Sequence, residues 1–318
     1  MNLQPVSTLG QCPPEICKKI FTYACNDGGF TGRSLSLVSR YIHNVSEDVK
    51  YHSLAICGMQ QILKCNDVLE NKPPHLRRIR HLFISGGTQV KPGQTRADIT
   101  EYKYGKKTNY DDGCYAFFNI LIMAAPTLIT FYLSSIDARP TILIPVPMKM
   151  LEEFTFFNEF QLGSPSTGPP EVDFPSLKRL RFVGFSNMTP ALFHEVYTRA
   201  PRITHLYFQT ERSGDELLEH LSSFFGLQAT RSTPLFNQFP EEFLRQIVEV
   251  RVEAPNKKRS FQAMQYERQI QRVTALEPRI KFTTVPEPYK IPFCYAYLDW
   301  LRDSTREWNF PVPHRFID

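Results

Sequence analysis

A short apolar pattern, Leu-x-x-Leu/Phe-x-Leu/Phe, returns along the middle of this 318-residue chain and follows a proline each time. Copies begin at Leu128, Leu151, Leu177 and Ile203, about 25 residues apart, and an earlier copy begins at Ile79. Self-similarity at such a period is the mark of stacked units, each of which buries its apolar face against its neighbours. The repeat therefore predicts a solenoid, a class of protein that binds partners more often than it transforms them.

Apolar and polar residues alternate within each copy, which predicts a short strand. We expect these strands to lie side by side in a parallel sheet. The segments 115–124, 191–200 and 213–225 have helical apolar spacing and are expected to cover one face of it. A period near 25 residues is typical of leucine-rich repeats. We therefore expect an α/β fold with an irregular leucine-rich-repeat-type solenoid and a C-terminal cap over residues 73–318.

The side chains that alternate away from this core would line the other, concave face of the sheet. Arginine and tyrosine dominate binding energy at protein interfaces, so a face rich in them suits a protein target. The residues predicted to bind the target are His81, Phe83, Tyr132, Glu153, Arg179, Arg181, His205 and Tyr207. The alternative is a solvated sheet face whose charges serve solubility.

Residues 11–72 have a different pattern and predict a helical module. Pro13 and Pro14 suit a helix start, because proline lacks the N–H group that the first turn leaves unused. That helix would share Ile16, Ile20, Phe21 and Ala24 on one face. Further helices are expected over 34–45, 49–57 and 59–70. So short a stretch has little apolar surface to bury, so we expect it to dock on the solenoid, on a partner, or on both.

Parts of this module resemble an F-box. Pro13-Pro14-Glu15-Ile16 followed by Ile20-Phe21 is similar to the opening of that motif, and Leu37-Val38-Ser39-Arg40-Tyr41 is similar to its core. With residues 23–41 and 73–85, the chain resembles the F-box-like proteins of mushroom-forming fungi. The resemblance implies docking on the Skp adaptor of a cullin ubiquitin ligase, with the repeats choosing the target. The adaptor contacts that it implies are Pro13, Pro14, Ile16, Ile20, Leu37, Val38, Ser39, Arg40 and Tyr41.

Other classes find little support in the sequence. A net charge of +5 is too weak to indicate nucleic-acid binding, and no apolar run is long enough to cross a bilayer. Seven cysteines without a Cys-x-x-Cys and no signal-peptide pattern indicate reduced thiols in the cytoplasm or nucleus. Nucleotide-binding, nucleophile-elbow and zinc spacings were not found. We therefore expect no enzyme, metal or cofactor.

Two alternatives stay open. One is a free-standing binding protein whose helical module is only a cap on the solenoid. The other is an enzyme with a pocket on the concave face. Polar or Pro/Gly/Ser-rich insertions at 86–113 and 163–170 are expected to form loops.

Overall fold

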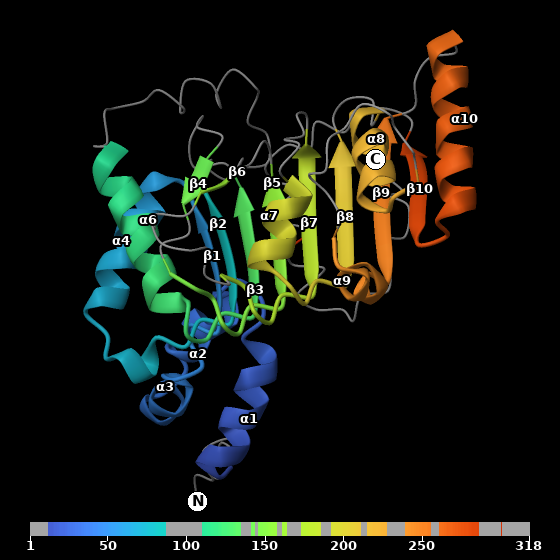
Figure 1. Cartoon of the computed structure of the whole chain (residues 1–318). Coiled ribbons are helices and arrows are strands. Elements are labelled where there is room, and N and C mark those ends of the chain that lie inside the picture. Colours follow the sequence, from blue (N-terminus) through green and yellow to red (C-terminus); the bar gives the residue numbers. More distant parts are fainter. Residues whose placement is uncertain are drawn as a thin grey trace, which may run out of the picture.

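The computed structural model describes residues 12–86, 110–134, 141–143, 146–157, 161–163, 173–185, 192–210, 215–227, 239–255, 261–285 and 300. Within them lies an eight-stranded, all-parallel sheet whose strands follow the order of the chain (Figure 1). The strands are β1 (Ser53–Cys57), β2 (His81–Ser85), β3 (Thr130–Ser134), β5 (Glu153–Phe157), β7 (Arg179–Phe185), β8 (His205–Thr210), β9 (Glu249–Pro255) and β10 (Ile280–Val285). A separate parallel pair joins β4 (Thr141–Leu143) to β6 (Gln161–Gly163).

Helices alternate with the strands, and Figure 1 shows the longer ones gathered on one side of the sheet. They are α4 (Met59–Glu70), α6 (Tyr110–Ala124), α7 (Leu192–Arg199), α8 (Asp215–Phe224) and α10 (Phe261–Leu276), with the shorter α9 (Glu241–Gln246) and the 3-10 turn η2 (Pro74–Leu76). Three more helices, α1 (Pro14–Ala24), α2 (Phe30–Leu35) and α3 (Arg40–Ser46), lie below the β1 end of the sheet. The expectation of an α/β fold with N-terminal helices and a parallel sheet is confirmed.

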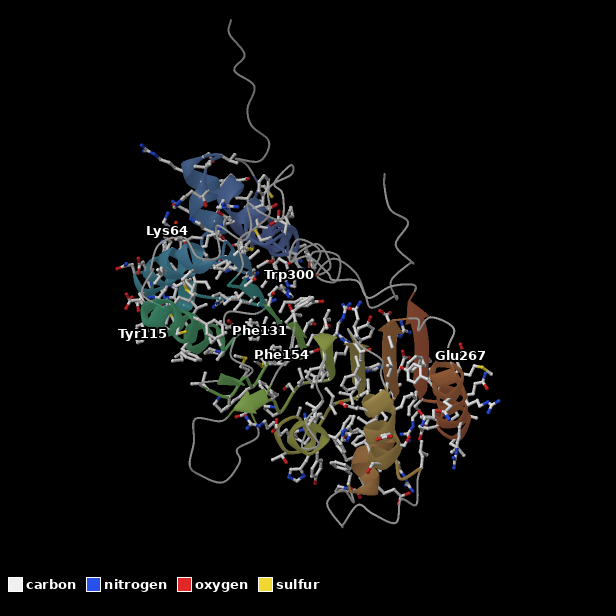
Figure 2. The ribbon with its side chains drawn as sticks, turned by 90° about the horizontal axis from the view of Figure 1, so that it is seen from above. Lys64, Tyr115, Phe131, Phe154, Glu267 and Trp300 are labelled. Atoms are coloured by element: carbon white, nitrogen blue, oxygen red, sulfur yellow. The ribbon has the colours of Figure 1, made fainter. Side chains whose placement is uncertain are left out.

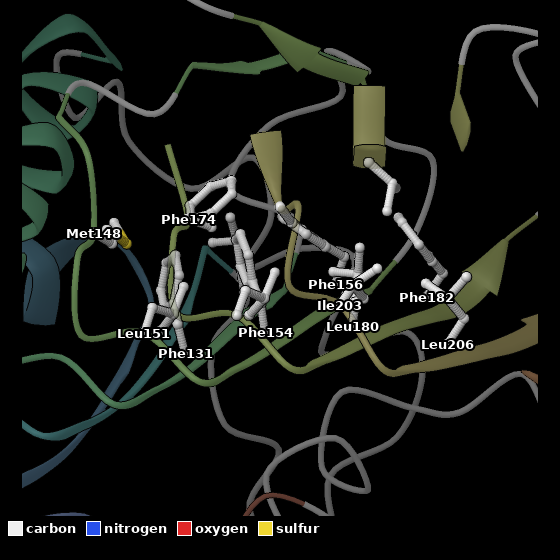
Figure 3. Packing of buried hydrophobic residues seen from close by; sticks show 14 of the residues in the cluster. Phe131, Met148, Leu151, Phe154, Phe156, Phe174, Leu180, Phe182, Ile203 and Leu206 are labelled. Atoms are coloured by element: carbon white, nitrogen blue, oxygen red, sulfur yellow. The ribbon is translucent and has the colours of Figure 1, made fainter. Parts of the chain in front are cut away.

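The apolar ladder between the sheet and its helices is the main core. Phe131, Phe154, Leu180 and Leu206 are partners in register across β3, β5, β7 and β8. All are buried, and Figure 3 shows them side by side. The rings of Phe131 and Phe154 stack with centroids 4.8 Å apart. The predicted repeat segments are therefore neighbouring parallel strands.

A repeated backbone contact sets the register of the strands. Near the start of each strand from β1 to β8 in the large sheet, one carbonyl oxygen accepts hydrogen bonds from two consecutive N–H groups of the next unit. The Ile129 carbonyl, for example, accepts from Glu152 N at 2.8 Å and from Glu153 N at 3.1 Å. The same arrangement recurs at the carbonyl oxygens of His52, Arg80, Glu152, Lys178 and Thr204. The units are thus equivalent in backbone geometry even where their side chains differ.

Two of the helices expected in the N-terminal region differ in the structure. The segment 49–57 was expected to be helical, yet Ser53–Cys57 is the strand β1, paired along its length with β2. A short apolar run is compatible with the period of a helix and with that of a strand, and pairing with β2 selects the strand. The helix expected over 34–45 is broken at Ser39, which is extended and whose hydroxyl accepts a hydrogen bond from Ile42 N at 3.2 Å. Ser39 is therefore the N-cap of α3.

The apolar side chains form a large and a small core. The large cluster runs from Ile56 through the sheet to Ile280. The small one holds Cys17, Phe21, Cys25, Ile42 and Val49, inside the N-terminal helices. Within the module predicted over 11–72, Ile56 of β1 and Ile62 and Leu69 of α4 belong to the large core.

Several predicted segments lie wholly or partly outside the described residues. They are most of the loop predicted at 86–113, the loop at 163–170, and the part of the predicted C-terminal cap after residue 285, of which only Trp300 is described. α6 begins at Tyr110, inside the first of these loops.

Candidate functional site

The face that α1 turns inward differs from the predicted one. Cys17 and Phe21 point into the small core, whereas Ile16 and Ile20 are exposed. The buried positions recur at a spacing of four residues, as one helix face requires. The sequence predicted one shared face for Ile16, Ile20 and Phe21, but Phe21 is buried while Ile16 and Ile20 are exposed. As a consequence, the large apolar side chains of Ile16 and Ile20 are in contact with solvent.

Helix α1 and the turn between α2 and α3 carry large apolar side chains that are exposed. Ile16 is 50% exposed, Ile20 55%, Leu37 87% and Val38 66%. All four were predicted to contact the adaptor. Tyr23 and Phe30 are also strongly exposed and were not predicted. The spacing of Ile16, Ile20 and Tyr23 places them on one face of α1, so helical periodicity alone could have added Tyr23.

The other predicted adaptor residues include two with structural roles. Ser39 caps α3, and the Tyr41 hydroxyl donates a hydrogen bond to the Cys12 carbonyl at 2.5 Å. Tyr41 thus ties the start of the module to α3. Pro13, Pro14 and Arg40 are exposed.

The N-terminal helices are joined to the free edge of β1 by glycines. Gly28 O accepts a hydrogen bond from Ala55 N at 3.2 Å, and Gly28 N donates to the Ser53 hydroxyl at 3.0 Å. Gly28 has φ 73° and Gly29 has φ 90°, which glycine adopts without strain. At Gly32 a Cβ would lie 2.4 Å from the Lys50 carbonyl oxygen. These contacts fix the helices against the sheet and cap part of its edge.

A second candidate surface is the sheet face opposite the helices. Strand register places the predicted target-binding residues in two rows across it. One row holds His81, Glu153, Arg179 and His205, and the next holds Phe83, Tyr132, Arg181 and Tyr207. The predicted sharing of one face is therefore confirmed, while target binding stays a prediction.

The β7–β10 end of this face is charged. Arg179 is ion-paired with Glu153. The Arg181 guanidinium lies 4.5 Å from the centre of the Tyr207 ring. Further along, Arg251 and Lys281 both bind Glu249, at 3.0 Å and 2.6 Å.

Glu249, Arg251 and Lys281 were not predicted as binding residues. They continue the same two rows onto β9 and β10. Apolar and polar residues alternate in the sequence at 249–253 and at 279–283, and this alternation could have identified them.

The β1–β3 end of the face is apolar and covered. Phe83, Tyr132 and Cys57 form a small buried cluster with Trp300, and Ala55 and Phe157 pack against it. Phe83 and Trp300 have ring centroids 5.7 Å apart. Figure 2 places Trp300 on the side of the strands opposite Phe131 and Phe154. We call Ala55, Cys57, Phe83, Tyr132 and Phe157 the aromatic socket.

The packing of Trp300 on this end of the face differs from the prediction that Phe83 and Tyr132 are available to bind a target. Phe83 and Tyr132 lie on the predicted face, but they do not line it as accessible side chains, because Trp300 buries them. Tyr207 is also buried. The residues that remain partly accessible are His81, Glu153, Arg179, Arg181 and His205.

The histidines of this face are held in the neutral form. Burial, with a smaller contribution from Arg80, lowers the pKa of His81 to about 4. Burial also lowers the pKa of His205. Their Nδ1 atoms lie 2.9 Å from the Thr130 hydroxyl and 2.8 Å from the Thr204 hydroxyl. At neutral pH these rings are hydrogen-bonding groups without charge, which suits recognition of polar groups.

Burial raises the pKa of Tyr207, so its phenol stays protonated as well. The face therefore combines uncharged hydrogen-bonding rings with arginines that are partly neutralised by carboxylates. Such a surface can bind a peptide segment through both shape and charge.

Across the described part of the chain, no group of three or more His, Cys, Asp or Glu side chains is placed to hold a metal ion. None of the helices described is long and apolar enough to span a bilayer. Comparisons with protein families, with curated proteins and with solved structures found no match for this chain.

Proposed function

We propose that the chain is an F-box-like substrate receptor of a cullin ubiquitin ligase, without enzymatic activity of its own. In this proposal α1–α3 dock on a Skp-type adaptor, and an irregular leucine-rich-repeat-type solenoid binds the target through its outward face. The F-box resemblance supplies the identity of the adaptor. The strand order and the equivalent backbone contacts of successive units support the solenoid.

The exposure of large apolar side chains on α1 and on the turn between α2 and α3 is the observation that carries the proposal. Ile16, Ile20, Leu37 and Val38 form no part of either core, although large apolar side chains gain most from burial. Large apolar side chains left exposed on a folded unit indicate a candidate interaction site where they adjoin one another. A partner that offers an apolar groove to short helices would bury it.

The adaptor interaction is tested by co-purification of the full chain with a Skp-type adaptor. Ile20→Asp and Leu37→Asp should each weaken the complex by roughly 30-fold or more, because a charge would enter a buried contact. Val248→Asp is the matched control, since Val248 is 59% exposed and lies before β9, far from α1 along the chain. It should leave the complex unchanged.

Ile20→Asp and Leu37→Asp each replace an exposed residue, so the far-UV circular dichroism of both variants should match that of the wild type. Unchanged adaptor binding in folded Ile20→Asp and Leu37→Asp would discard the docking surface. A folded chain that binds no adaptor at all would favour the free-standing binding protein. The structural roles of Ser39 and Tyr41 favour that second candidate, because a cap alone would need them.

Target binding is tested separately on the other surface. Arg181→Glu reverses a charge on the outward face, next to Tyr207. In cells that express the tagged chain, proximity labelling should lose the target proteins while the adaptor is retained. Equal recovery of every labelled protein with this variant would place the target elsewhere.

A further inference from the structure

Two cysteine side chains meet where α1 begins. Pro13 is the N-cap of this helix, and its carbonyl oxygen accepts a hydrogen bond from Cys17 N at 3.1 Å. Cys12 and Cys17 therefore occupy the position just before the cap and the fourth position of the helix. Side chains at these two positions pack against each other in the hydrophobic staple that fixes many helix starts. Here both members of the staple are thiols.

The contacts of the pair show how closely it is held. The Cys12 carbonyl oxygen accepts a hydrogen bond from Cys17 Sγ at 3.8 Å, and Cys12 packs against the small core that contains Cys17. The same oxygen accepts the Tyr41 hydroxyl at 2.5 Å, which ties this segment to α3. A side-chain hydrogen bond with Cys17 is the main reason that the pKa of Cys12 is raised. Both cysteines are free thiols, so the two groups are neighbours without a bond between them.

The two thiols differ in their access to solvent. Cys12 is partly exposed, whereas Cys17 is only 1% exposed. A reagent in solution therefore reaches Cys12 first. Cys17 lies behind it, in the place of a resolving thiol that completes a disulfide.

The third cysteine of the small core is not placed to take part. Cys25 is the C-cap of α1, eight residues beyond Cys17. At 1.5 Å a residue, the two Cα atoms are about 12 Å apart along the helix axis. A disulfide requires Cα atoms within about 7 Å of each other. Burial also raises the pKa of Cys25 to about 11, which keeps it in the unreactive thiol form.

We infer that Cys12 and Cys17 are a redox-active dithiol that closes to a disulfide across the start of α1. The reagent class is a small disulfide such as oxidised glutathione. The Cys12 thiolate attacks one of its sulfur atoms and releases one glutathione thiolate. The Cys17 thiolate then attacks Cys12 Sγ, forms the Cys12–Cys17 bond and releases the second glutathione thiolate. The two thiol protons pass to these thiolates, so the chain loses two electrons and the reagent gains two.

The closed loop would contain three of the residues predicted to contact the adaptor, Pro13, Pro14 and Ile16. The redox state of the pair thus sets how firmly this segment is held at the start of α1. The inference does not depend on the proposed function, because closure of the disulfide needs no adaptor.

The test treats the folded full chain with oxidised glutathione at about pH 8, since a raised pKa makes the Cys12 thiolate scarce at neutral pH. After an acid quench, reduced thiols are alkylated in denaturant and the chain is digested with trypsin. Lys18 is the first lysine or arginine, so the peptide 1–18 carries Cys12 and Cys17 and no other cysteine. In most molecules this peptide should lose two hydrogens and take up no alkyl group. The peptide 20–33 carries Cys25 alone and is the internal control, which should be alkylated.

Two variants test the order of the steps. Cys17→Ala keeps the small core apolar and should trap glutathione on Cys12 as a mixed disulfide, because the resolving thiol is gone. Cys12→Ser should slow the oxidation of Cys17 about ten-fold or more, because the reagent does not reach a buried thiol directly. Oxidation of Cys17 in Cys12→Ser at the wild-type rate would contradict this order and overturn the inference.

The wild-type measurement needs no substitution, so it decides the inference even if a variant fails to fold. A mixed disulfide that accumulates on Cys12 of the wild-type chain would show that Cys17 does not reach it. A peptide 1–18 that stays fully alkylated would show that the pair does not react. Either result would overturn the inference.

Discussion

The rings of Phe182 and Phe208 stack face to face, with centroids 5.3 Å apart and planes 6° from parallel. The two residues are register partners on β7 and β8, and both are buried in the main core. Their contact joins two successive units of the chain, as the alternation in each unit predicts.

Phe182→Ala should therefore destabilise the whole sheet. Truncating a buried phenylalanine removes its burial and leaves a cavity, at a cost of about 3–5 kcal/mol. The free energy of unfolding, measured by urea titration with circular dichroism, should fall by that amount. Met264→Ala, at an exposed position of α10, is the control and should change it by less than about 0.5 kcal/mol. A loss for Phe182→Ala no larger than the control's would contradict the packing.

Gly32→Ala should loosen the N-terminal helices while the sheet stays folded. The added Cβ would meet the backbone carbonyl of Lys50, which cannot move aside as a side chain can. Because Gly32 lies in α2, next to the small core, limited proteolysis should cut the first 50 residues several-fold faster. Ser34→Ala, an exposed position of the same helix, is the control. Equal proteolysis of both variants would show that α2 can shift at no cost.

The stability of the fold should fall as the pH is lowered from 6.5 toward 4. His52 is buried, and desolvation together with Arg80 lowers its pKa to about 4. In the unfolded chain a histidine has a pKa of about 6.5, so within this window only the unfolded state binds the proton. The stabilisation is complete above the window.

Urea midpoints at pH 7.5 and pH 5 measure this effect. His52→Gln should show a smaller drop in midpoint between the two pH values than the wild type does. Part of the drop should remain, because the pKa of His81 is also lowered to about 4. An identical drop in both chains would mean that His52 is protonated in the folded state.

Asp173 and Arg199 form an ion pair that joins the end of α7 to the turn before β7. Arg199 Nη1 donates to Asp173 Oδ2 at 2.8 Å, and each side chain is only 13% exposed. Asp173→Asn removes the negative charge beside a largely buried guanidinium and should cost about 2–4 kcal/mol. The exposed pair of Glu241 and Arg245 is the matched control, where Glu241→Gln should cost less than about 0.5 kcal/mol. Similar losses in unfolding free energy for the two variants would contradict the effect of burial.

The strands of the sheet were predictable where the repeat was regular. The segments near Leu128, Leu151, Leu177 and Ile203 carry two apolar positions in alternation after a proline, and each is followed by a strand in register with its neighbour. The residues of both outward rows followed from the same alternation. These features depend on local periodicity, which the sequence displays directly.

Features set by contacts between distant segments could not be predicted. β1 was expected to be a helix, because its apolar run is short and only pairing with β2 selects the extended form. The burial of Phe83 depends on Trp300, more than 200 residues away in the chain. Local patterns do not encode which distant side chain covers a sheet face.

The strand order of the sheet has a mechanical consequence. Each strand of the eight-stranded sheet is hydrogen-bonded only to the strands of the units before and after it in the chain. In such an array, stability is close to a sum of nearest-neighbour terms. Tension applied between β1 and β10 would therefore separate the strands one after another, and the sheet would not rupture in a single event.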